Sequence, residues 1–212
     1  MEDMTSALTL DIGSYGIDLP DGWHPMPLTN DGAARSWAHA TSVELTDDPE
    51  AREFLVGQLN DLRERLRARS DGNLSAAAYV PHPDLGRVAC LLYTELIWLE
   101  DDDSADSYEA MIRAEEHRRR PGETVREQEV WRIDEADRNI VAAFQVMAYR
   151  EPGEDAGWLE YRARYGVFVH GARQQVYLAF TATDLTAFDD MVRDTQAVVQ
   201  TLAVELDPAS DS

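Results

Sequence analysis

Histidine is the side chain most often used for acid-base catalysis and metal binding, and this chain has five of them. They are His24, His39, His82, His117 and His170. None has a second histidine or a carboxylate at a metal-ligand spacing such as H-E-x-x-H. His24, His82 and His117 lie beside turn or charged segments, where we expect exposed side chains. The local sequence predicts neither a metal site nor a catalytic histidine, and only a site assembled in three dimensions stays open.

Nucleophilic catalysis has few candidates. The single cysteine, Cys90, lies in the apolar run "RVACLLYTELIWL", whereas a reactive thiolate needs cationic neighbours and solvent access. All 19 basic residues are arginines, so lysine chemistry such as Schiff-base formation is excluded. No G-x-S-x-G elbow, G-x-G-x-x-G loop or phosphate loop is present. The sequence therefore predicts a buried structural thiol, no catalytic residue, no cofactor and no metal.

Two charged clusters have the composition of a binding site. The run "EDDDSAD", which includes Asp101, Asp102 and Asp103, has the oxygens that Ca²⁺ prefers but lacks the spacing and glycine of a calcium loop. We interpret it as an exposed loop that precedes a helix. The run "HRRRPG" contains Arg118, Arg119 and Arg120, which suit the C-terminus of that helix. These three arginines are the candidates for contact with an acidic partner.

The charge of the chain limits its partners. It has 41 acidic and 19 basic residues, which gives a net charge of −22. Such a field repels nucleic acid and anionic membranes and attracts basic proteins. DNA mimicry is disfavoured because the acids are interleaved with arginines. With no apolar run of about 20 residues and no basic N-terminal region, we expect no membrane span, no signal peptide and a cytoplasmic location.

The clearest helix follows Asp48, a plausible N-cap, with Pro49 at the first helical position. Four leucines at spacings of four, three and four form one apolar stripe. They are Leu55, Leu59, Leu62 and Leu66. The stripe is flanked by Arg63 and Arg67 on one side and by Arg65 and Arg69 on the other. Arginines beside a buried stripe usually lay their stems over it, and this reading is favoured over an anion site.

Strands dominate the rest of the chain. The runs at 88–99 and 139–149 are apolar at both odd and even positions, which indicates strands covered on both faces. In the run at 158–169, Glu160, Arg162 and Arg164 alternate with apolar residues, so we expect a strand that is half exposed or near an edge. Residues 30–36 read as a loop. A final helix is predicted from about Asp184 to Leu206, with Phe188 and Leu202 buried.

The predicted order is strand, helix, two strands, helix, four strands, helix. Short gaps between strands favour antiparallel pairing. Strands that are apolar on both sides need helices on both faces. We therefore expect one α/β (α+β) domain over residues 1–212, ordered from about 8 to 206, with a largely antiparallel sheet flanked by helices in an α/β/α sandwich.

Two segments, one near each end of the chain, resemble parts of a known domain family. The segment "IDLPDGW" at 17–23 resembles the strand, turn and tryptophan that open PsbP-like domains. The segment "VYLAFTATDLTAFDDMVRDTQAVVQTL" at 176–202 resembles their closing strand and helix. The resemblance implies an α/β/α sandwich with an antiparallel sheet, and binding or assembly work. The family shares no catalytic residues, so none is carried over.

These observations predict a non-enzymatic cytoplasmic binding or accessory protein that acts by association with another protein. A chaperone, an immunity factor or a secretion accessory would fit. From the net charge we expect the partner to be basic. The alternative is an enzyme whose site is assembled from dispersed Asp or Glu, Arg and His side chains. The sequence predicts no particular oligomeric state.

Overall fold

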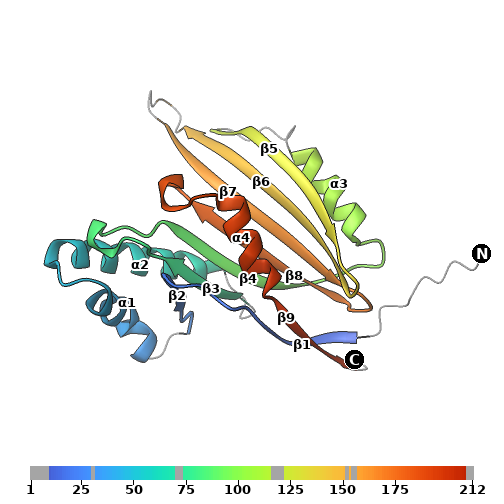
Figure 1. Cartoon of the computed structure of the whole chain (residues 1–212), viewed down its shortest axis with the longest axis horizontal. Coiled ribbons are helices and arrows are strands. Elements are labelled where there is room, and N and C mark those ends of the chain that lie inside the picture. The colour runs from blue at the N-terminus through green and yellow to red at the C-terminus, as the bar shows by residue number, and fades with distance from the viewer. Residues whose placement is uncertain are drawn as a thin grey trace, which may run out of the picture.

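A seven-stranded antiparallel sheet runs through the centre of the molecule (Figure 1). The computed structural model describes residues 10–29, 32–69, 74–115, 122–150, 153 and 157–208. The strand order is β2-β3-β4-β8-β7-β6-β5. The strands are β2 (Trp23–Met26), β3 (Leu74–Tyr79), β4 (Cys90–Trp98), β5 (Glu123–Asp134), β6 (Arg138–Arg150), β7 (Gly157–Val169) and β8 (Gln174–Ala182).

Three helices cover one face of this sheet. Tyr93 pairs with Ala179, Ala179 with Arg164, and Arg164 with Ala143, so these four side chains form a row on one face. Tyr93 packs against the core beneath α1 (Gly32–Leu45) and α2 (Pro49–Arg69). Ala143 packs beneath α3 (Ala105–Glu115) at the other end of the row. The middle of the row therefore lies between the helices.

The opposite face carries α4 (Met191–Gln200), which crosses the near side of the sheet in Figure 1. Val198 and Val199 of α4 pack against the main core, to which Leu178 and Phe180 of β8 belong. Helices thus lie on both faces of an antiparallel sheet. The α/β/α sandwich expected from the sequence is confirmed.

The helix predicted after Asp48 is confirmed as α2. The Oδ1 atom of Asp48 accepts hydrogen bonds from the backbone N–H groups of Glu50 at 2.9 Å and Ala51 at 3.4 Å, which caps the helix as expected. Leu55 and Leu59 on its stripe are fully buried. Packing of this stripe on the sheet fixes the rotation of α2 about its axis. The rotation in turn determines which side chains of α2 point over the neighbouring part of the sheet.

One arginine of α2 departs from the prediction. Arg63 is only 3% exposed, and its guanidinium does not reach solvent. Its Nε donates to the carbonyl oxygen of Pro27 at 2.8 Å and its Nη2 to that of Thr29 at 2.6 Å. The expectation that Arg63 lays only its stem over the stripe is therefore wrong. Its charged head ties α2 to the segment after β2.

The final predicted helix is also corrected. Asp184 caps a short 3₁₀ turn, η2 (Leu185–Ala187), and Asp190 caps α4, because each side chain accepts from a backbone N–H two or three residues later. Two capping aspartates break the predicted helix into two. Leu202 is buried as expected, whereas Phe188 lies between η2 and α4, half-buried against Tyr79.

The chain beyond Leu202 forms a strand rather than helix. This strand, β9 (Ala203–Pro208), pairs with β1 (Leu10–Gly16) in a separate antiparallel sheet. Arg173 holds β1 against the β7–β8 turn through an ion pair with Asp11, whose two carboxylate oxygens accept at 2.9 and 2.8 Å. The expected strand at residues 17–19 is wrong, since the strand ends at Gly16.

Helix α1 was not predicted, because residues 32–36, read as loop, form its first turns. Its buried contacts are small residues such as Ala34 and Ala38, which give a weak apolar pattern.

A second short turn, η1 (Pro83–Leu85), connects β3 and β4. Within the described part of the chain, no helix is both long and apolar enough to cross a membrane.

Candidate functional site

The arginines proposed for partner contact, Arg118, Arg119 and Arg120, lie outside the described residues, as does His117. His39, His82 and His170 are exposed. The structure therefore describes four of the five histidines and tests none of the three arginines as a contact surface.

His24 differs from the expectation of an exposed side chain. It lies in β2, is only partly exposed, and its Nε2 atom is buried without a partner among the described residues. Burial lowers the pKa of His24, and the charge of Glu44 opposes that shift. The neutral imidazole is therefore favoured in the folded protein.

Cys90 is buried, as predicted from its apolar run. Burial raises the pKa of the thiol well above its ordinary value. Its Sγ donates to the carbonyl oxygen of Leu91 at 3.7 Å. The folded protein therefore keeps Cys90 as a neutral thiol.

The acidic loop is exposed at Asp101, Asp102 and Asp103, as expected. The Oδ2 atom of Asp103 accepts from the backbone N–H of Glu100 at 2.9 Å, which closes the loop before α3. Over the whole described part of the chain, no group of three or more histidines, cysteines or acids is placed to hold a metal ion.

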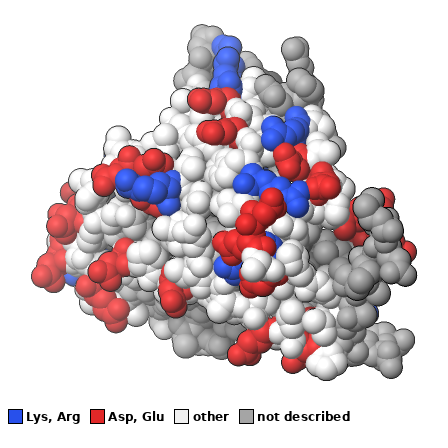
Figure 2. Space-filling view, turned by 45° about the vertical axis from the view of Figure 1, so that its right-hand side comes forward, with Lys and Arg blue, Asp and Glu red and all other residues white. Residues whose placement is uncertain are grey.

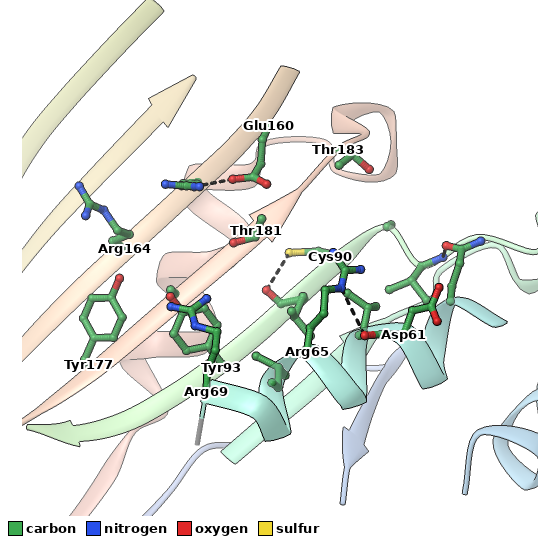
Figure 3. Close-up of a pocket in the computed structure, with 18 residues that line it drawn as sticks. Asp61, Arg65, Arg69, Cys90, Tyr93, Glu160, Arg164, Tyr177, Thr181 and Thr183 are labelled. Atoms are coloured by element: carbon green, nitrogen blue, oxygen red, sulfur yellow. Dashed lines mark hydrogen bonds and ion pairs between the residues drawn. The ribbon is translucent and has the colours of Figure 1, made fainter. Parts of the chain in front are cut away.

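The structure instead brings together residues that the sequence analysis had kept apart, in a groove of about 570 Å³ between α2 and the sheet (Figure 3). One wall is α2 and the floor is made by β4, β8 and β7. Four arginines and two carboxylates line it. These charged residues are Arg65, Arg69, Arg162, Arg164, Asp61 and Glu160.

The wall follows from the apolar stripe of α2. Because Leu59 and Leu66 point into the core, Arg65 and Arg69, one turn apart, are turned toward the groove. Arg65 donates its Nε to the carbonyl oxygen of Asp61 at 3.2 Å. The Arg69 guanidinium lies 5.7 Å from the ring centre of Tyr93, at cation–π distance. Among the described residues, neither arginine forms an ion pair.

The floor follows from the alternation of side chains along β7. Arg162 pairs in register with Thr181 of β8, and Arg164 pairs with Ala179, so both arginines share a face with the groove. We expected a strand that is half exposed or near an edge: β7 is not at an edge, because it has β6 on one side and β8 on the other, but its polar residues Glu160, Arg162 and Arg164 are partly exposed. Its polar residues face the space that α2 and α3 leave uncovered.

Both floor arginines are anchored. Arg164 donates from Nη2 to Glu115 of α3 at 2.6 Å, and Arg162 is hydrogen-bonded to Glu160 and to the hydroxyl of Tyr149. Burial alone would lower the pKa of both guanidiniums, but the neighbouring carboxylates raise it above its ordinary value. Both arginines therefore stay charged and in place.

Three buried polar atoms near the inner part of the groove have no partner among the described residues, and of their residues only Arg164 lines the groove. They are Nε of Arg164, the hydroxyl of Tyr108 and Oε1 of Gln175. Burial raises the pKa of Tyr108 to about 12 and also raises that of Tyr177, which lines the groove. At neutral pH both hydroxyls are protonated; that of Tyr177 is hydrogen-bonded to Tyr93, and that of Tyr108 has no acceptor among the described residues. A polar ligand or water would satisfy such groups.

The groove continues into a second hollow of about 390 Å³. The two hollows share the lining residues Gln58, Val88, Ala89 and Thr183. The second hollow is bordered by His82, Arg87 and Asp184, and by Leu85, which is 65% exposed. Together they form an elongated track from Arg69 at the end of α2 to η1, with four arginines at one end and, at the other, an exposed leucine beside Arg87 and Asp184.

This arrangement can bind an anionic group, because guanidinium and hydroxyl donors converge on one space. The sequence had a signal for it: Glu160, Arg162 and Arg164 alternate on a long strand. The signal was read as solvent exposure, since only the strand order places this face beside Arg65 and Arg69.

No protein-family model matches the chain, and no curated protein sequence does. Among solved structures, the chain is similar to cyanobacterial PsbP (CyanoP) from Synechocystis sp. PCC 6803, with a TM-score of 0.42 and 9% sequence identity. The similarity covers 97% of this chain and 98% of that chain. That protein is a PsbP, the family that the two ends of the sequence resemble.

Proposed function

We propose that the protein is a non-enzymatic binding protein that docks a segment of another protein in the groove beside α2. The observation that carries the proposal is the elongated track of two connected hollows, of about 570 and 390 Å³, with polar donors along it. A compact small molecule needs one enclosed pocket, whereas an extended polypeptide needs a long open one.

The lining supports a polypeptide segment in a second way. The track has charged donors at Arg65 and Arg69 and apolar surface at Leu62 and Val88, and Leu85 is exposed at the far end. A segment with both polar and apolar side chains can use every part of this surface. The expected cytoplasmic location remains part of the proposal.

An enzyme remains the alternative, since a polar groove is what a dispersed active site would use. It would need two close carboxylates, or a carboxylate beside a histidine. In Figure 3, Asp61 lies on the α2 wall and Glu160 lies on β7 in the floor, away from Asp61, and Glu160 is hydrogen-bonded to Arg162. The arrangement suits docking better. A screen against general hydrolase and transferase substrates tests the alternative, and reproducible turnover lost on replacing Glu160 would favour it.

Docking is tested by filling the groove. Thr181 lies on its floor, so Thr181→Trp places a large ring there; Thr124→Trp on β5 is the matched control, because Thr124 is exposed and does not line the groove. Peptides from a displayed random library, selected on the unmodified protein, should lose binding to Thr181→Trp and keep it with Thr124→Trp. Melting curves check that both variants fold. Selected peptides that ignore Thr181→Trp would refute docking in the groove.

A further inference from the structure

We infer that the segment docked in the groove is acidic at one end: its carboxylates lie between Arg65 and Arg69 on the wall and Arg164 on the floor, and an apolar side chain further along rests on Leu85. This inference rests on the proposed function and names the chemistry of the docked segment. It also departs from the basic partner that the net charge of −22 favours, because it concerns the lining of the groove and not the whole surface.

The wall arginines supply the first argument. Arg65 and Arg69 are exposed and four residues apart, and like charges at that spacing on a helix repel each other. Arg67 on the same helix is compensated by Glu64 at 2.8 Å, whereas the described residues give Arg65 and Arg69 no such ion pair. A carboxylate bound between them would relieve the repulsion and gain charge-assisted hydrogen bonds.

The floor supplies the second argument. The Arg164 side chain is 14% exposed, and Glu115 occupies its Nη2, but its buried Nε has no acceptor among the described residues. An unsatisfied buried donor is costly, and more so on a charged group. A ligand oxygen at Nε would remove that cost.

The distribution of charge gives the segment its direction. Asp61 lies one turn before Arg65 and lines the groove toward Gln58, so it repels a carboxylate there. Beyond Gln58 the charge of Arg87 acts on Asp184, which offsets it. Acidic side chains therefore belong at the Arg69 end, and the apolar side chain belongs beyond Gln58, where Leu85 is exposed. The binding site is therefore selective for the order of acidic and apolar residues in the segment as well as for their charge.

The acidic surface outside the groove limits what can enter. Figure 2 shows acidic side chains spread over the face in view, with arginines among them. At a net charge of −22, long polyanions such as nucleic acid are repelled at long range. A short acidic segment on a partner of low net charge is repelled much less and gains the local contacts of the groove.

The test compares a synthetic peptide rich in Glu and Asp and ending in Leu with an isosteric Gln and Asn peptide, and with free glutarate. Isothermal titration calorimetry measures their affinity for the unmodified protein. The charge variants are Arg65→Gln with Arg69→Gln, and the control is Arg67→Gln, because Arg67 lies on the same helix and does not line the groove. The acidic peptide should bind, the double variant should weaken it about tenfold or more, and the control should change it by less than about twofold.

The outcomes separate the two proposals. If the Gln and Asn peptide binds as tightly as the acidic peptide, or if the double variant keeps its affinity, the proposal that the segment is acidic is refuted. If glutarate binds as tightly as the peptide, the groove is a small-molecule site and the proposal of a polypeptide ligand is refuted. If the library peptides whose binding Thr181→Trp blocks prove neutral or basic, the docking proposal is supported and the proposal of an acidic segment is refuted. If Thr181→Trp blocks no peptide, docking itself fails.

Discussion

The hydroxyl of Tyr165 on β7 lies 2.8 Å from Oγ1 of Thr195 on α4, and the two side chains are buried. The Thr195 hydroxyl also lies 2.7 Å from the carbonyl oxygen of Met191, and the Tyr165 hydroxyl lies 3.4 Å from that of Val192, so the pair is joined to the backbone of α4. This hydrogen bond is a polar tie between the sheet and α4 in an otherwise apolar contact.

Tyr165→Phe should therefore lower the free energy of unfolding by about 0.5–1.5 kcal/mol, since it removes the bond and little else. Urea unfolding followed by circular dichroism measures the loss. Tyr161→Phe is the control: Tyr161 lies on the same strand and face, and its hydroxyl forms no hydrogen bond with any of the described residues. Equal effects of both substitutions would contradict a special role for the Tyr165 hydroxyl.

Replacement of Arg63 should destabilise the protein without touching the groove. Arg63→Met keeps an apolar stem but removes the donors to the carbonyl oxygens of Pro27 and Thr29. We expect a loss of about 1–3 kcal/mol in urea unfolding. Arg67→Met removes only a partly exposed ion pair with Glu64 and should cost less than about 0.5 kcal/mol. A neutral Arg63→Met would show that its buried hydrogen bonds contribute nothing.

His24 should make stability depend on pH. Its pKa is lowered in the folded state, first by burial, from an unfolded value of 6.5. As the pH falls below about 6.5, the unfolded chain takes up a proton that the folded chain resists, so the free energy of unfolding falls until the folded pKa is passed. His24→Gln should lose less stability between about pH 7 and pH 5 than the unmodified protein.

Glu44 provides the check on the cause. Its charge raises the pKa of His24, so Glu44→Gln should lower that pKa further and extend the loss of stability to more acidic pH. The measurement is a series of urea unfolding curves across this range. Identical pH profiles for the unmodified protein and His24→Gln would rule out the histidine as the source.

Cys90 should be unreactive until the protein unfolds. Its thiol is buried and its pKa is raised by burial, so little thiolate is present to attack a disulfide reagent. The rate of labelling with a chromogenic disulfide should rise steeply across the denaturant transition. An exposed thiol introduced as Ser75→Cys in a Cys90→Ala background gives the rate for an accessible site. Rapid stoichiometric labelling of native Cys90 would contradict its burial.

The sequence predicted what local patterns determine. The stripe of Leu55 and Leu59 and the cap at Asp48 located α2, and the two-sided apolar runs required helices on both faces. The prediction failed where local signals competed. Asp184 and Asp190 each cap the start of a helical segment, so one predicted helix is two. The alternation of Val204 and Leu206 is too short to predict a strand. Helix α1, with alanines as its buried contacts, has too little periodicity to be recognised.

The groove could not be predicted for a different reason. Arg65 is separated from Arg164 by about half the chain, and the two meet only because β4, β8 and β7 are neighbours in the sheet. That order depends on pairing between distant strands, which no local pattern encodes. The alternation of Arg162 and Arg164 with apolar residues marked a polar face correctly, but not whether water or a groove lies over it.

The pairing of β1 with β9 has a consequence for synthesis. Residue Leu10 pairs with Pro208, so β1 leaves the ribosome long before its partner exists. At translation rates of about 5–20 residues per second, β1 waits on the order of ten seconds or more. During that time its backbone donors and acceptors are available to other chains, which is a risk for an unpaired strand. The contacts of Leu10 and Arg173 at the β7–β8 turn form earlier than β9 and can hold β1 in place until the last strand arrives.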